Sequence, residues 1–123
     1  MSQQVVCLSV PAQPLFARSV RMMAANLAVV INMDVDDVED LRMAAEEGFV
    51  YACATKPEAC DIVFELDESS IAINFTLGDN TSSDDDALQY ANLLLSAICD
   101  EYDVDHANKK LRLVKVSGGA HAN

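Results

Sequence analysis

Two segments with alternating apolar side chains constrain the fold of this chain most strongly. In residues 62–66 and again in residues 71–77, every second side chain is isoleucine, phenylalanine or leucine. A period of two places these side chains on one face of a β-strand. The "ESS" sequence between the segments supplies a turn. The two segments therefore predict a β-hairpin with one buried face.

Other segments predict elements that can extend or cover this hairpin. Residues 4–10 are rich in β-forming side chains and stop at Pro11, which predicts a short first strand. Apolar residues recur at helical spacing from Pro14 to Asn32 and predict a helix of nearly five turns. "EYDVDH" and "KLRLVKV", which flank the turn "ANK", predict a second hairpin whose lysine and arginine side chains suit an outer strand.

A second helix is predicted from the acidic stretch "MDVDDVED" to about Thr55. Asp34 or Asp36 can serve as its N-cap, and the further acids suit the positive end of the helix dipole. Its apolar residues lie on two sides, because one stripe runs from Val38 to Ala52 while a second group lies opposite. The second group comprises Met43, Val50, Tyr51 and Ala54. We expect a ligand, a lid, another helix or another chain to cover it.

A third helix is predicted over residues 84–99. Ser83 followed by Asp84, Asp85 and Asp86 is typical of a helix start, and we interpret these acids as caps rather than as a cation site. The helix is apolar nearly all round, so we expect it to be packed on more than one side. The element order is βααββαββ, which predicts an α+β fold, a two-layer α/β sandwich, with residues 1–117 as a single domain and 118–123 as a flexible tail.

Length and charge narrow the function classes. The 123 residues suffice for one domain with one core. A formal charge of −12 repels phosphate backbones and anionic lipids, so we expect no nucleic acid and no membrane partner but a basic or apolar protein surface. The start "MSQQVVCLSV" does not resemble a signal peptide, and no apolar run is long enough to span a bilayer. We therefore expect a cytoplasmic protein.

The cysteines and histidines give no sign of a metal or catalytic centre. The four cysteines form no CxxC pair and have no histidine at ligand spacing, so we predict no zinc site, no other metal site and no redox motif. Buried free thiols are the expectation. His106 has no paired serine, cysteine or carboxylate that would indicate a triad.

The sequence "VEDLRMAAEEGFVYACAT", within this element order, resembles the anti-sigma-factor serine kinases of bacterial partner switching. That family carries the ATPase fold of histidine kinases, DNA gyrase and heat-shock protein 90, and the resemblance spans roughly residues 5–117. The family motif on the second helix has the form E-x-x-x-N-A. Glu47 takes the glutamate position, Ala52 takes the alanine position, and Tyr51 stands where the asparagine belongs. The resemblance thus implies a catalytic position at Glu47 and a cofactor-binding position at Tyr51.

All three nucleotide-binding motifs of the family are altered here. The family asparagine binds the magnesium ion of ATP, and a tyrosine is a poor substitute for that short oxygen ligand. The adenine-binding aspartate and glycines follow the hairpin, where this chain has "INFTLGDN": Leu77 takes the natural register, and Gly78 and Asp79 remain. "TSSDDDAL" replaces a glycine-rich phosphate turn with carboxylates that repel a triphosphate. We expect no cofactor, and ATP with magnesium only if the family activity survives.

The resemblance and its altered motifs leave three possible functions. The first is a regulatory binding protein that contacts a sigma factor or an antagonist protein and has an inactive ATP site. The second is an active ATP-dependent serine/threonine protein kinase. The third is a homodimeric small-molecule-binding or structural α+β module. The altered motifs favour the first, so we predict that the chain is not an enzyme.

The resemblance also predicts how such a regulator is built. Its family members commonly pair as dimers, so we expect a homodimer. The second helix faces the nucleotide pocket in the family, so we expect Met43, Val50 and Tyr51 to fill that pocket beneath the third helix. We expect the carboxylates of "DVDDVED" to face basic residues of the client.

Overall fold

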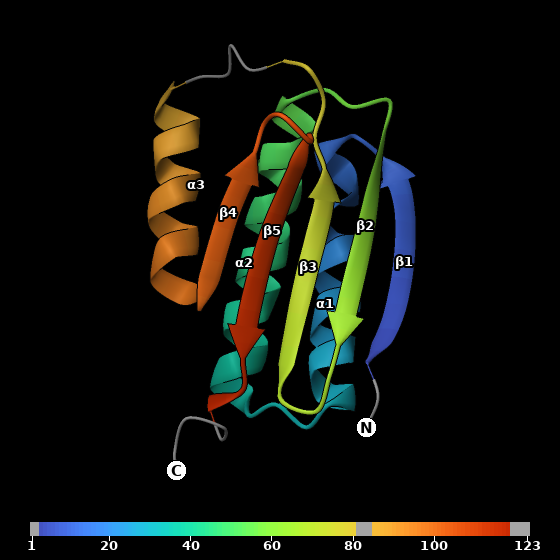
Figure 1. Ribbon diagram of the computed structural model, residues 1–123, viewed down its shortest axis with the longest axis vertical. Helices are drawn as coiled ribbons and strands as arrows, with labels where there is room; N and C mark the ends of the chain where they lie inside the picture. Colours follow the sequence, from blue (N-terminus) through green and yellow to red (C-terminus); the bar gives the residue numbers. More distant parts are fainter. Residues whose placement is uncertain (1–2, 81–84, 119–123) are drawn as a thin grey trace.

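The computed structural model describes residues 3–80 and 85–118, which form a five-stranded sheet with three α-helices (Figure 1). The α+β class predicted from the sequence is confirmed. The elements are β1 (Gln4–Pro11), a 3-10 turn η1 (Pro14–Phe16), α1 (Ala17–Val30), α2 (Val35–Ala54), β2 (Ala59–Leu66), β3 (Ser70–Thr76), α3 (Asp85–Ile98), β4 (Glu101–Asp105) and β5 (Lys110–Val116).

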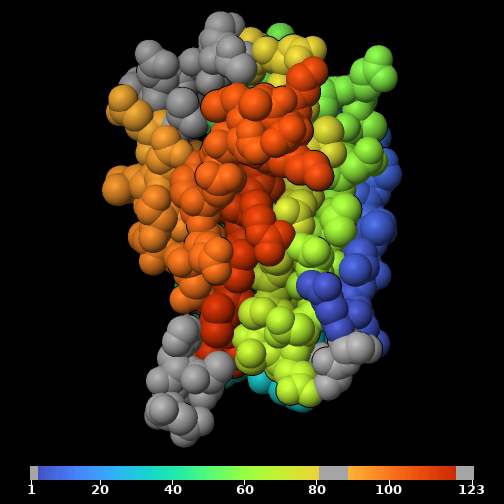
Figure 2. Space-filling view, viewed as in Figure 1, coloured from blue at the N-terminus to red at the C-terminus, as the bar shows by residue number. Residues whose placement is uncertain are grey.

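All strand pairs in the sheet are antiparallel, in the order β1-β2-β3-β5-β4. The predicted hairpin is β2 and β3, in which Phe64 pairs with Ile73, and Ile73 in turn pairs with Leu113 of β5. These three side chains are at most 1% exposed and belong to one continuous core. Alternation thus places one face of the sheet against the helices, while Figure 2 shows strand side chains across the opposite face.

Helix α2 lies at the centre of the helical layer, between α1 and α3 and against β3 and β5. Asp34, rather than Asp36, caps it, because an Asp34 carboxylate oxygen accepts the N–H of Asp37 at 2.9 Å. Gly48 allows close contact with the sheet, since a Cβ there would lie 2.7 Å from the ring of Phe75. The helix ends at Ala54, as the sequence predicts to within a residue.

The second apolar side of α2 is covered only in part. Tyr51 is 6% exposed, but Met43 is 41% and Val50 is 38% exposed. The expectation that all three fill an interior pocket is therefore wrong for Met43 and Val50. Because α1 and α3 contact α2 on its two flanks, a strip of its surface between them remains open to water.

Helix α3 packs against two neighbouring elements and leaves its outer side exposed. It lies beside β4 at one edge of the molecule, against α2 (Figure 1). Ala91 and Leu95 are buried there, whereas Tyr90 is 58% and Leu93 is 74% exposed. The helix thus packs against two elements, α2 and β4, but its outer side is open to water because it lies at the edge of the layer.

Two parts of the predicted scheme lie outside the described residues. They are residues 81–84, with the predicted capping residues Ser83 and Asp84, and the tail residues 119–123. Among the described helices, none combines the length and the apolar character needed to cross a membrane.

Candidate functional site

The residues singled out from the sequence occupy two separate places. Glu47 and Tyr51 lie one turn apart on α2, and therefore on the same side of that helix. Gly78 and Asp79 follow β3 and line an open hollow of about 450 Å³ at one end of the sheet. Neither Glu47 nor Tyr51 lines that hollow, so the four residues do not form one pocket.

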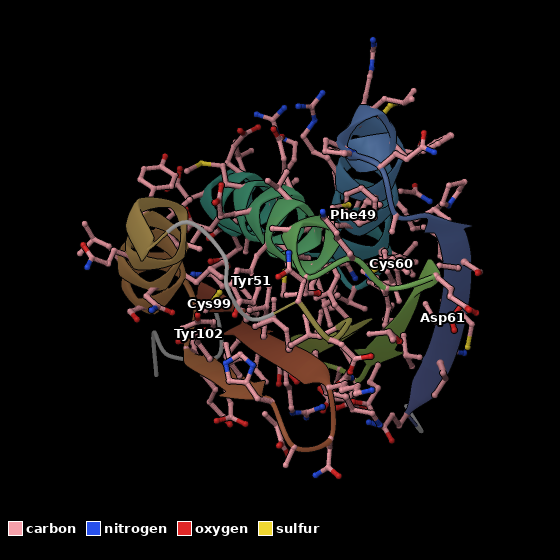
Figure 3. The ribbon with its side chains drawn as sticks, turned by 90° about the horizontal axis from the view of Figure 1, so that it is seen from above. Phe49, Tyr51, Cys60, Asp61, Cys99 and Tyr102 are labelled. Carbon is pink, nitrogen blue, oxygen red and sulfur yellow. The ribbon has the colours of Figure 1, made fainter. Side chains whose placement is uncertain are left out.

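Tyr51 is buried, and the partly buried Cys99 and Tyr102 lie beside it between α2, α3 and β4 (Figure 3). Burial raises the pKa of Tyr51. Burial, followed by the neighbouring Tyr51 and Cys99, raises the pKa of Tyr102 to about 12. The Tyr102 hydroxyl forms a hydrogen bond with Asn92 of α3. The two phenols are therefore neutral at physiological pH.

Glu47 is half-buried and makes no hydrogen bond or ion pair with another described side chain. Burial, and secondly the charge of the adjacent Glu46, raise the pKa of its carboxyl group. Glu46 itself is paired with Arg21 of α1 at 2.8 Å. The described residues contain no cluster of three or more side chains suited to a metal ion.

Leu77 occupies the position where the resemblance expects an adenine-binding aspartate. Its side chain is 2% exposed and belongs to the hydrophobic core. Asp79, two residues later, points outward with 85% of its side chain exposed and pairs with Lys109 at 2.6 Å. Its carboxylate is therefore bound to the turn between β4 and β5 rather than directed into the interior.

Gly78 has a structural role that its sequence position alone does not reveal. Its N–H donates to the hydroxyl of Thr55 at 2.7 Å, and that hydroxyl donates to the carbonyl of Ala52 at 2.6 Å. A Cβ at Gly78 would lie 2.2 Å from the carbonyl oxygen of Thr55 and 2.4 Å from the carbonyl carbon of Lys56. Glycine is thus needed because the chain after β3 lies directly against the end of α2.

Two acidic side chains at the start of α2, Asp37 and Asp40, make contacts within the molecule. Asp37 is 6% exposed and accepts the N–H of Gly118 at 2.6 Å. The ammonium group of Lys115 lies 3.1 Å from Asp40 and also donates to the carbonyl of Ile98 at 3.1 Å. The expectation that the whole "DVDDVED" stretch faces a client is therefore wrong for the buried Asp37, whereas Asp40 pairs with Lys115 and keeps 37% of its side chain exposed. Asp36 and Glu39 remain exposed.

The contact between Lys115 and the acidic side chains of α2 could not be predicted from the sequence, because these residues are far apart in the chain. Lys115 and Asp40 are 75 residues apart, and no local spacing predicts their contact. Burial opposes the charge of Lys115, but the hydrogen bond from Lys115 to Asp40 and the nearby carboxylates raise its pKa overall. The ammonium group is therefore charged and satisfied at physiological pH, and its role is to hold β5 against α2.

No known protein family and no curated protein matches the sequence. Among solved structures, the fold is similar to the crystal structure of the RsbU and RsbW domains of Rv1364c from Mycobacterium tuberculosis, with a TM-score of 0.68 and 13% sequence identity. The similarity covers 93% of this chain and 32% of that one, so this chain spans about a third of the length of that protein chain. At 13% sequence identity, this similarity shows a shared fold and nothing about function.

Proposed function

We propose that this protein is a bacterial partner-switching regulator that binds a protein client on an anti-sigma-factor scaffold without using ATP. The observation that carries the proposal is the burial of Tyr51, at the position where the resembling family has its magnesium-binding asparagine. The likeness of fold to a structure that includes an RsbW domain supports the scaffold. The sigma factor or antagonist protein implied by the resemblance supplies the class of client.

The packing around α2 favours a closed nucleotide site. The ring of Tyr51 occupies space between α2, α3 and β4, and Leu77 is buried where a carboxylate would be needed for adenine (Figure 3). Gly78 lies against the end of α2, and the hollow that it lines with Asp79 is separate from Tyr51. In this proposal neither ATP nor magnesium binds, Glu47 has no catalytic role, and the chain is not an enzyme.

The helical layer is the surface that we assign to the client. Exposed large apolar side chains are concentrated on the three helices, and such groupings are typical of protein-binding surfaces. They are Met22, Val29, Val30, Val35, Met43, Val50, Tyr90 and Leu93. A chain with a net charge of −12 favours a client that combines basic with apolar groups over nucleic acid or anionic lipid. We place this interaction in the cytoplasm.

Capture of the client tests the proposal. The immobilised full chain is exposed to native cytoplasmic extract from which nucleotides have been removed, with and without added magnesium and ATP, and bound proteins are identified by mass spectrometry. The proposal predicts a client that is retained equally in both conditions and is not phosphorylated. Retention that depends on ATP, or a client phosphorylated on serine or threonine by the purified chain, would instead support the kinase.

Two variants locate the contact. Leu93→Asp places a charge on the exposed face of α3 and should reduce retention of the client at least several-fold. Leu15, which is also 74% exposed, lies in η1 outside the three α-helices, so Leu15→Asp is the matched control and should leave retention unchanged. Equal effects of both substitutions, or no effect of either, would place the client on another surface.

A further inference from the structure

One side of α2 alternates between acidic and apolar side chains and is open to water. Asp36, Met43, Glu47 and Val50 follow one another at helical spacing. At about 100° per residue, these four lie within about 60° of one another around the helix axis. Asp36 is exposed, Met43 and Val50 are 41% and 38% exposed, and Glu47 is half-buried. We call these four residues the outer stripe of α2.

The neighbouring helices lie on either side of the outer stripe and leave it uncovered. Helix α1 packs along one flank of α2 and α3 along the other, as the view from above shows (Figure 3). Because the stripe follows the axis of α2, the surface that it offers to a partner is long and narrow. A partner helix lying along α2 matches this shape, since packed helices have their axes about 8–10 Å apart.

Glu47 has a charge that the described residues do not compensate. It forms no ion pair or hydrogen bond with a described side chain, whereas the adjacent Glu46 pairs with Arg21 of α1 at 2.8 Å. Burial, and secondly the charge of Glu46, raise the pKa of Glu47. Both causes disfavour the charged form, and a cation close to the carboxylate would favour it again. A partner that brings a cation to Glu47 therefore supplies the missing interaction.

Asp36 provides a second acidic position at the start of the same stripe. It forms no ion pair with a described side chain, whereas Glu39, one turn later, pairs with Arg42. Asp36 and Glu47 are eleven residues apart, which corresponds to about 16 Å along the axis at about 1.5 Å per residue. Eleven residues nearly complete three helical turns, so two basic residues at this spacing also share one face of a partner helix.

We propose that the outer stripe of α2 binds an amphipathic helix of the protein client, which places basic residues at Glu47 and Asp36 and apolar residues against Met43 and Val50. The proposal rests on the proposed function and narrows the client surface from the helical layer to one side of one helix. Charge complementarity selects the occupant, because the stripe offers two carboxylates and the chain has a net charge of −12. An acidic or uncharged helix would leave Glu47 without a cation.

Two synthetic helical peptides test the proposal without a natural client. Each is a fluorescent peptide of about five helical turns with leucine along one face, alanine and glutamine elsewhere, and two lysines. In the matched peptide the lysines are eleven residues apart within the leucine face. In the control peptide they are nine residues apart, which turns one lysine to the opposite face without changing composition or charge. Fluorescence anisotropy should show that the full chain binds the matched peptide at least fivefold more tightly.

Variants of the chain test which residues make the contact. Glu47→Gln should weaken binding of the matched peptide at least fivefold, with an unchanged circular dichroism spectrum. Glu101→Gln removes the same charge from β4, outside the helical layer, and should change the affinity less than twofold. Met43→Ser removes an apolar contact and should weaken binding several-fold, whereas Met22→Ser, at an exposed position on α1, should have little effect.

Cross-linking with a water-soluble carbodiimide locates the contact. The reagent joins a carboxylate to a nearby amine through an amide bond and is itself converted to a urea. Mass spectrometry of the digested product should find the peptide lysines joined to Glu47 and Asp36. Lysines joined mainly to the acids of β4 would overturn the proposal. So would an intermolecular bond between Glu47 and a lysine of this chain, because a second copy would then cover the stripe.

Three further results would overturn the proposal: no binding of either peptide, equal affinity for both, and equal effects of Glu47→Gln and Glu101→Gln. Capture of the client separates this proposal from the proposed function. Retention that Leu93→Asp reduces and Glu47→Gln does not would overturn the outer stripe as the contact and leave the regulatory function standing. Peptide binding that depends on Glu47, together with a client retained only with ATP, would sustain the stripe and overturn the nucleotide-independent function.

Discussion

The ammonium group of Lys115 lies 3.1 Å from the carboxylate of Asp40 and 3.9 Å from that of Asp37. It thereby joins the end of β5 to the first turns of α2. Asp37 also accepts the N–H of Gly118, so the main chain after β5 is bound to the same helix. Part of the acidic stretch "DVDDVED", which the sequence suggested as a client surface, thus stabilises the fold by binding β5 and the chain after it to α2.

Replacing Asp37 should therefore weaken the fold. Asp37→Ala removes a buried carboxylate that accepts one hydrogen bond and faces Lys115, and we expect the free energy of unfolding to fall by about 2 kcal/mol. Asp36→Ala, one residue earlier and exposed, should change it by less than about 0.5 kcal/mol. Urea denaturation of both variants measures the difference. Equal stabilities would show that the Asp37 contacts contribute nothing.

Gly78 provides a second prediction, because its surroundings are main-chain atoms that have little room to move. Gly78→Ala should lower the free energy of unfolding by about 3 kcal/mol, since the added methyl group meets the backbone of Thr55 and Lys56. Gly48→Ala is the control: its methyl group meets the movable ring of Phe75, and alanine favours a helix by about 1 kcal/mol. We expect a smaller loss there. If Gly78→Ala is neutral, this residue does not have the structural role assigned to it.

Tyr51 should behave as a core residue. Tyr51→Ala leaves a cavity between α2, α3 and β4 and should cost about 3 kcal/mol of unfolding free energy. The adjacent Val50 is 38% exposed, so Val50→Ala should cost less than about 1 kcal/mol. Thermal unfolding followed by circular dichroism distinguishes the two. A melting temperature unchanged by Tyr51→Ala would remove the basis for a filled pocket.

Stability should fall as the pH rises above about 9. Burial is the main cause that raises the pKa of Cys60 from 9.0 to about 12, and burial raises that of Cys53 to about 11. Below pH 9 these thiols are protonated in both the folded and unfolded chains. Above it the unfolded chain releases protons that the folded chain retains, so unfolding becomes more favourable as pH rises towards the folded pKa values.

Melting temperatures measured from neutral to alkaline pH test this thiol effect. Cys60→Ala should flatten the alkaline decline, whereas Cys7→Ala, which removes an exposed thiol, should keep it. If the melting temperatures of both variants fell with pH as steeply as that of the unmodified chain, the loss of stability would not come from the Cys60 thiol. Tyr102, whose pKa burial raises to about 12, adds to the decline in all of these chains.

The elements that could be predicted from the sequence are those with local signals. Alternation in residues 62–66 and 71–77 predicted the central hairpin, and Asp34 was one of the two predicted caps of α2. The exposure of Leu93 on α3 could not be predicted, because an apolar periodicity does not show whether a helix lies at the centre or the edge of a layer. The contact between Lys115 and Asp40 joins segments 75 residues apart and has no local signal.

The candidate site shows the same division. The resemblance to the family motifs predicted Tyr51 and Gly78 as site residues. Only the tertiary packing shows that Tyr51 is buried and that Gly78 lies against the end of α2. Asp79 was a candidate for adenine binding by sequence position, yet its side chain is turned towards Lys109 at the surface. The direction in which a loop side chain points depends on tertiary contacts, which sequence position does not reveal.

Isothermal titration calorimetry of the folded chain with magnesium and ATP tests whether the nucleotide site is closed. We predict no binding heat above that of dilution, even at millimolar nucleotide, because Tyr51 and Leu77 are buried where the ligand contacts would lie. Circular dichroism before and after the titration establishes that the chain is folded throughout. A saturable binding isotherm would contradict a closed site and identify the protein as a nucleotide-binding member of the kinase class that it resembles.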